Sequence, residues 1–122
     1  MGVRIEVQMT VRTQGLSDRV IAALVRGETK AAERGLTHAV DLSPMDVGTL
    51  IDAHQVVPAV NPEEGAAVVV DTPYARRLHE HPEYNFSTDS NPNAQGKWLE
   101  TAMVENRKEL GDIIRKEVTD AL

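Results

Sequence analysis

The chain has 122 residues, a net charge of −6 at pH 7, no cysteine and an aromatic content of only 3%. The length fits a single domain, and the lack of cysteine excludes disulfides, thiolate metal sites and cysteine nucleophiles. The negative charge disfavours non-specific DNA binding, which depends on Lys and Arg at the phosphates. No apolar run is long enough to predict a membrane-spanning helix, so we expect no membrane partner.

The first part of the chain predicts strands on either side of one long helix. Residues 3–11 alternate between apolar and polar side chains, which predicts a half-buried strand. Ser17 suits a helix N-cap, and apolar residues at helical spacing carry this helix to about residue 39. Residues 49–58 and 66–71 predict two further strands, joined by a hairpin-like turn. The strand at 66–71 is apolar on both faces, so we expect it at the centre of the sheet.

The second part predicts a short helix, a long loop and a final helix. Pro73 suits the start of a helix that ends near His81, and residues 83–95 are polar, as expected of a mobile or partner-binding loop. A helix is predicted from residue 96 to 118, with Trp98 at its start and packed against the body. We therefore expect one α+β domain over residues 1–122. Its small antiparallel or mixed sheet carries two long helices on one face, with the short helix and the long loop beside them.

The polar residues give little indication of catalysis or metal binding. His79 and His81, with His54, could suggest a metal site, but residues two apart on a helix point in different directions. An acid/base site beside His54 could be imagined from three aspartates: Asp41, Asp46 and Asp52. Turn and capping roles account for this aspartate-rich region, and no nucleotide-binding or nucleophile motif is present. We expect no catalytic residue, no metal and no cofactor.

All four aromatic residues fall between positions 74 and 98. Aromatic and arginine side chains are the preferred anchors of protein interfaces, so this segment concentrates binding or packing energy. We expect Tyr74, Leu78 and Trp98 to pack in the core. The candidate partner interface comprises the remaining aromatic residues, an arginine pair and two asparagines: Arg76, Arg77, Tyr84, Phe86, Asn91 and Asn93.

Three segments in order give the chain a familiar outline. They are Pro44-Met45-Asp46-Val47-Gly48-Thr49-Leu50, then residues 68–80 (VVVDTPYARRLHE), then residues 91–100 (NPNAQGKWLE). Over about residues 17–118 the chain resembles the small neck proteins of long-tailed bacteriophages, called minor capsid, head-tail connector or tail-completion proteins. The family's turn often has Thr where Val47 stands, and residues 83–95 are longer than in many relatives.

The resemblance implies a non-enzymatic subunit of the virion neck, assembled in the cytoplasm of the bacterial host. Copies of the subunit would form a ring between the connector or stopper on the portal side and the tail terminator or tail-tube proteins. DNA would pass through the lumen without specific binding. Two alternatives remain: a small non-viral protein-binding or regulatory module, and an enzyme that uses His54, His79 or His81 as general base.

Overall fold

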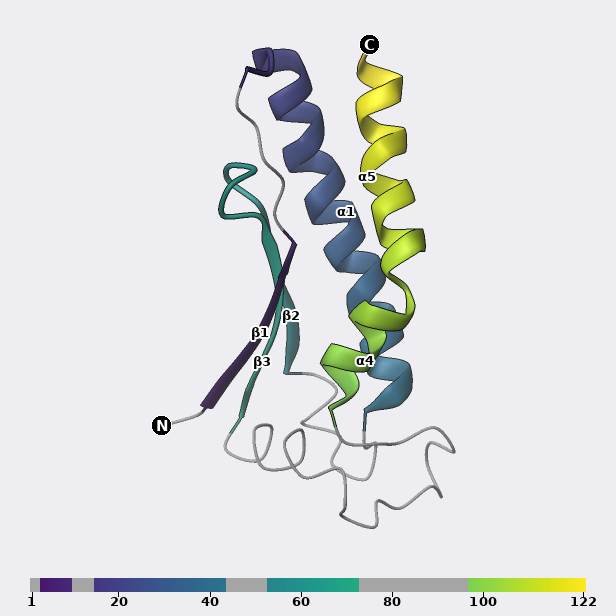
Figure 1. The fold of residues 1–122 in the computed structure, drawn as a ribbon. Helices are drawn as coiled ribbons and strands as arrows, with labels where there is room; N and C mark the ends of the chain where they lie inside the picture. Colours follow the sequence, from purple (N-terminus) through teal and green to yellow (C-terminus); the bar gives the residue numbers. More distant parts are fainter. Residues whose placement is uncertain (1–2, 10–14, 44–52, 73–96) are drawn as a thin grey trace.

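The computed structural model describes residues 3–9, 15–43, 53–72 and 97–122. These residues form an α+β fold in which helices cover one face of an antiparallel sheet (Figure 1), which confirms the predicted class. The elements in chain order are β1 (Val3–Met9), α1 (Asp18–Leu42), β2 (His54–Val57), β3 (Ala66–Thr72), α4 (Trp98–Glu105) and α5 (Arg107–Ala121).

The three strands pair in the order β1-β3-β2, and both pairings are antiparallel. The register places Val68 of β3 between Val7 of β1 and Val56 of β2. Successive side chains alternate across a strand, so Val68 lies on the face that joins the core while Val69 lies on the other face. Both are buried, at 0% and 3% exposure. The central position predicted for this strand from its two apolar faces is confirmed.

Helix α1 begins where the sequence predicts. The hydroxyl of Ser17 accepts a hydrogen bond from the Val20 amide. Asp18 lies in the first turn, where its negative charge interacts favourably with the helix dipole. The helix continues past the predicted end to Leu42, and Ser43 then caps it by donating to the Val40 carbonyl.

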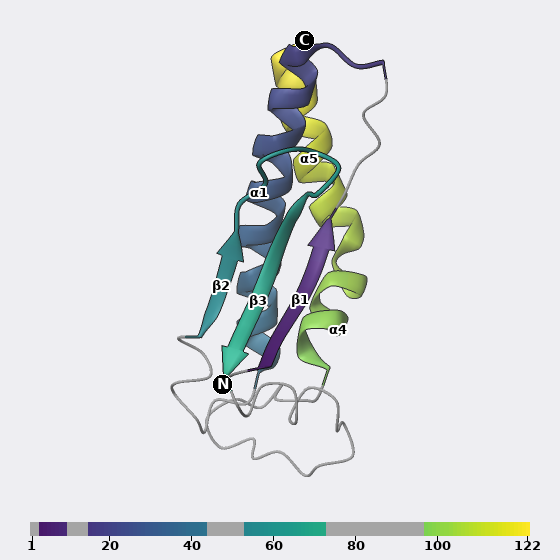
Figure 2. The same ribbon diagram turned by 90° about the vertical axis from the view of Figure 1, so that its left-hand side faces the viewer.

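Helices α1 and α4 pack directly on the sheet, and α5 packs on α1. Helix α1 packs against β2 and β3, α4 lies beside β1, and α5 runs antiparallel to α1 along its length (Figures 1 and 2). Two glycines of α1 allow α5 and α4 to approach it closely. A Cβ at Gly27 would lie 3.0 Å from the Ile114 Cα, and one at Gly35 would lie 2.6 Å from the end of Met103. The predicted second long helix therefore packs mainly on α1.

The prediction of one final helix from 96 to 118 was wrong, because α4 ends at Glu105 and α5 begins at Arg107. Asn106 interrupts the helix with φ −106° and ψ 12°, and its side-chain amide donates to the Ala102 carbonyl at 2.8 Å. Asparagine favours such local bonds over continued helix. Of the predicted strand 49–58, β2 covers His54–Val57, Ala53 is a turn residue, and residues 49–52 lie outside the described part of the chain.

Candidate functional site

The candidate partner-binding segment joins one end of the fold. Strand β3 ends at Thr72 and α4 begins at Trp98, and both lie at the end of the molecule where α1 also ends and β2 begins (Figure 1). The six predicted interface residues lie outside the described part of the chain: Arg76, Arg77, Tyr84, Phe86, Asn91 and Asn93. The same holds for other residues weighed in the sequence: Asp46, Asp52, Tyr74, Leu78, His79 and His81. The described site is therefore the frame that holds the two ends of residues 73–96.

The central contact of this frame joins Trp98 to His54. The indole Nε1 of Trp98 donates to Nε2 of His54 at 2.9 Å, and the rings lie 6.2 Å apart with a tilt of 54°. Trp98 has no exposed surface and His54 is 8% exposed. The predicted burial of Trp98 is confirmed.

The donor fixes the state of the imidazole. Indole N–H can only donate, so His54 Nε2 must accept without a proton, and the proton of the neutral ring is on Nδ1. In this arrangement the Nε2 lone pair is directed to Trp98 rather than to a metal ion or a substrate. His54 therefore acts here as a structural acceptor that ties β2 to the start of α4.

The backbone around the pair explains its geometry. His54 is opposite Val70 in the register and shares its row, which faces the core. Lys97, just before Trp98, adopts the left-handed conformation with φ 52°, an uncommon one for a residue with a side chain. This turn brings the chain into α4 with the indole directed at the sheet.

Glu28 is a second unusual residue, which the sequence analysis missed. It has 0% exposure in the middle of α1, and in the described part of the chain neither of its carboxylate oxygens has a hydrogen-bond partner. Burial, and secondarily the charge of Glu63, raise the pKa of Glu28 to about 7. Its position offered a signal, because it lies four residues after Leu24 and three before Ala31 on the apolar face of the helix.

Charged side chains join α1 to α5 at two levels. Glu117 of α5 accepts from Arg26 at 3.2 Å and from Lys30 at 2.8 Å. About two helical turns away, the carboxylate of Glu109 accepts a hydrogen bond from Arg34, and His38 Nε2 lies 3.2 Å from the same carboxylate. Hydrogen bonds from Lys30 and Arg26 lower the pKa of Glu117, and a hydrogen bond from Arg34 lowers that of Glu109. These contacts fix the register of the two helices.

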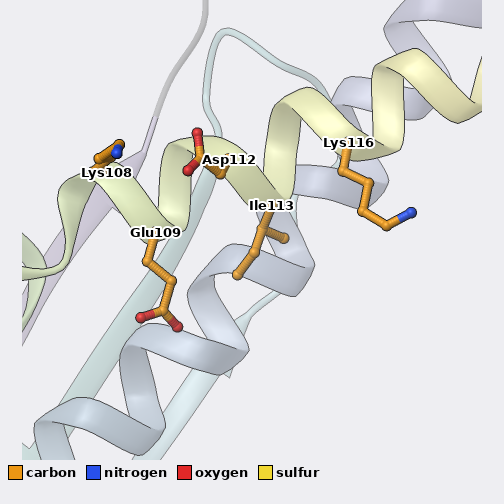
Figure 3. A pocket seen from close by; sticks show the side chains of 5 residues that line it. All are labelled: Lys108, Glu109, Asp112, Ile113 and Lys116. Carbon is orange, nitrogen blue, oxygen red and sulfur yellow. The ribbon is translucent and has the colours of Figure 1, made fainter.

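Among the described residues, two hollows flank α5. One, of about 420 Å³, is lined by Lys108, Glu109, Asp112, Ile113 and Lys116, and Glu109 and Ile113 point from it toward α1 (Figure 3). Its lining combines two basic and two acidic side chains with Ile113. The other, of about 480 Å³, has apolar walls that include Leu24, Ile114 and Val118.

Within residues 3–9, 15–43, 53–72 and 97–122, no three His, Asp or Glu side chains lie close enough together to hold a metal ion. None of the helices in that part of the chain has both the length and the apolar character needed to cross a bilayer. Comparisons with protein-family models, curated proteins and solved structures give no match to this chain.

Proposed function

We propose that the chain is a non-enzymatic structural subunit of a bacteriophage neck. Copies of it form a ring that joins the DNA-filled head, on its connector side, to the tail tube. The observation that carries this proposal is the ordered set of sequence segments at 44–50, 68–80 and 91–100, which follow one another as in the phage neck proteins.

The frame around residues 73–96 supports a binding role for that segment. Thr72 closes a strand in the centre of the sheet, and Trp98 is fully buried and hydrogen-bonded to His54. A binding segment held at both ends on a packed body loses less freedom on association than a free tail. The position of these two ends therefore favours partner contacts through Arg76–Asn93.

The composition of the core also favours assembly. The buried cluster consists mostly of Ala and Val, with Trp98 as its single large aromatic among the described residues. Small aliphatic side chains bury less area than Phe or Trp, so association with neighbouring copies adds stability that the isolated core supplies only modestly. Contacts between different patches of neighbouring copies close into a ring.

The net charge of −6 suits a ring whose lumen lets DNA pass. Phosphate binding needs Lys and Arg, and an acidic subunit holds DNA weakly. The alternative is a small non-viral protein-binding or regulatory module that uses the same segment for a different partner.

Deleting the gene from the phage that encodes it tests the proposal. We expect filled heads and finished tails that fail to join, visible by negative-stain microscopy, and restoration of joined virions when the gene is supplied in trans. Joined virions without the protein would contradict the neck assignment. A purified protein that stays monomeric and captures a non-viral partner would favour the alternative.

Substitutions in the segment separate binding from folding. Replacing Tyr84 and Phe86 by Ala should leave the melting temperature nearly unchanged and abolish incorporation into virions, since interface aromatics commonly contribute about 2 kcal/mol or more. The matched control replaces Lys108 and Lys116, on the outer side of α5, by Ala and should leave incorporation intact. If replacing Tyr84 and Phe86 by Ala unfolds the protein, these aromatic residues belong to the core instead.

A further inference from the structure

Glu28 is buried on α1 and is the neighbour in sequence of Thr29, the residue that the turn after β2 contacts. Residues 58–65 connect β2 to β3 and lie in front of α1 in Figure 2. The amide of Ala59 donates to the hydroxyl of Thr29 at 3.0 Å, so this connection is bonded to α1 at the residue next to Glu28. The Thr29 hydroxyl in turn donates to the Val25 carbonyl at 3.1 Å. We call residues 58–65 the hairpin loop.

Two hydrogen bonds brace the turn of the hairpin loop between Asn61 and Gly65. The Glu64 amide donates to the side chain of Asn61 at 2.8 Å, and the Gly65 amide donates to the Asn61 carbonyl at 3.1 Å. Ala59 and Pro62 are buried. The buried residues of the loop are therefore apolar, and the loop is hydrogen-bonded to α1 at Thr29.

Among the described residues, no opposite charge offsets ionisation of the Glu28 carboxyl. Glu63, from the hairpin loop, adds a like charge that disfavours ionisation of Glu28. The nearest bases in sequence on α1, Arg26 and Lys30, are bonded to Glu117 of α5. A buried carboxylate with no hydrogen bond and a like-charged neighbour is costly, whereas the protonated acid is tolerated.

We propose that the hairpin loop is a proton-controlled latch: it stays closed on α1 while Glu28 carries its proton, and it opens when Glu28 ionises. The proton is released to solvent, and water that enters beside the opened loop solvates the carboxylate. The Ala59–Thr29 hydrogen bond breaks in the same step. The latch depends only on the contacts of residues 58–65 with α1, and therefore does not rest on the neck assignment.

Proton linkage gives the size of the effect. The closed form holds the Glu28 proton up to a pKa of about 7, while an exposed Glu releases it at its ordinary value of 4.5. The population of the open form relative to the closed form should therefore rise on the order of 50-fold between about pH 5 and about pH 8.

Amide hydrogen exchange at Ala59, followed by NMR on the whole chain, tests the latch. After correction for the intrinsic pH dependence of exchange, we expect the protection of this amide to fall on the order of 50-fold from about pH 5 to about pH 8. Glu28→Gln should remove the pH dependence. The matched control, Glu64→Gln, changes an exposed carboxylate of the same loop and should leave the pH dependence in place.

A second measurement keeps the proposal testable if the Glu28 variant does not fold. The ¹³C shift of the wild-type Glu28 carboxyl should titrate together with the loss of Ala59 protection. Protection of Ala59 that is constant with pH, or that changes equally in wild type and Glu28→Gln, would overturn the latch. A Glu28 carboxyl that titrates near its ordinary value of 4.5 would do so as well.

Discussion

The hydrogen bond from Trp98 Nε1 to His54 Nε2, at 2.9 Å, joins two residues 44 positions apart and fixes the first residue of α4 to the first residue of β2. Both residues begin their elements at the end of the fold from which residues 73–96 extend. The pair therefore couples the stability of the body to the position of the candidate binding segment.

Replacing Trp98 by Phe tests how much this hydrogen bond contributes to stability, because Phe keeps an aromatic ring and removes the donor. We expect a loss of about 1–3 kcal/mol in the free energy of unfolding, measured by urea denaturation. Trp98→Ala should cost about 3–5 kcal/mol because it also leaves a cavity. Val104→Ala, at a position 56% exposed on the same helix, is the control and should change stability little. A Phe variant as stable as wild type would show that the hydrogen bond contributes nothing net.

The two glycines of α1 should respond differently to alanine. At Gly27 the new Cβ would press on the backbone of Ile114, so α5 must shift. At Gly35 it would press on the flexible end of Met103 and make an ordinary contact with Leu110 at 3.7 Å. Alanine gains about 1 kcal/mol of helix propensity at either position. We expect Gly27→Ala to lower the melting temperature and Gly35→Ala to leave it equal or raise it. The reverse order in thermal unfolding would show that the helix contact is looser at Gly27 than at Gly35.

Glu28 should make the protein less stable as the pH rises. Its folded-state pKa of about 7 lies above the ordinary value of 4.5, so the native state holds more protons than the unfolded state between these values. The native state carries no penalty from Glu28 below pH 4.5, and a penalty of about 3 kcal/mol develops as the pH rises through 7. Glu28→Leu should remove this slope and raise stability at about pH 8, as measured by urea denaturation across pH. An unchanged slope in the Leu variant would assign the pH dependence to other groups.

Glu109 and Glu117 should have the opposite effect on the acid side. Arg34 lowers the pKa of Glu109, and Lys30 with Arg26 lowers the pKa of Glu117. The stability that these carboxylates contribute is therefore present above their ordinary pKa of 4.5 and is lost as the pH falls below it. Glu117→Gln should reduce the loss of melting temperature on acidification and the sensitivity to salt at neutral pH. Glu100→Gln, an exposed carboxylate on α4, serves as the control. Equal acid sensitivity in wild type and Glu117→Gln would show that the contacts of Arg26 and Lys30 with Glu117 contribute little to stability.

Local pattern determined much of the secondary structure. Alternation predicted β1, the apolar run of Val68–Val70 predicted a central β3, and Ser17 with the helical spacing after it predicted the start of α1. These features depend on neighbouring residues: the period of the apolar side chains and the capping of the first amides. The hairpin turn before Gly65, which adopts φ 67°, follows from the same local chemistry.

A competing local hydrogen bond and contacts between distant residues decided the rest. The apolar face of residues 98–118 predicts a helix, but the break at Asn106 arises from a side-chain bond to Ala102 that competes with the backbone bonds. The pairing of Trp98 with His54 and the isolation of Glu28 depend on which surfaces meet when α1, the sheet and α4 pack together. A sequence states which side chains are apolar or charged, but solvation and hydrogen-bond partners are set only by packing, and these determine whether a buried polar residue stabilises the fold or strains it.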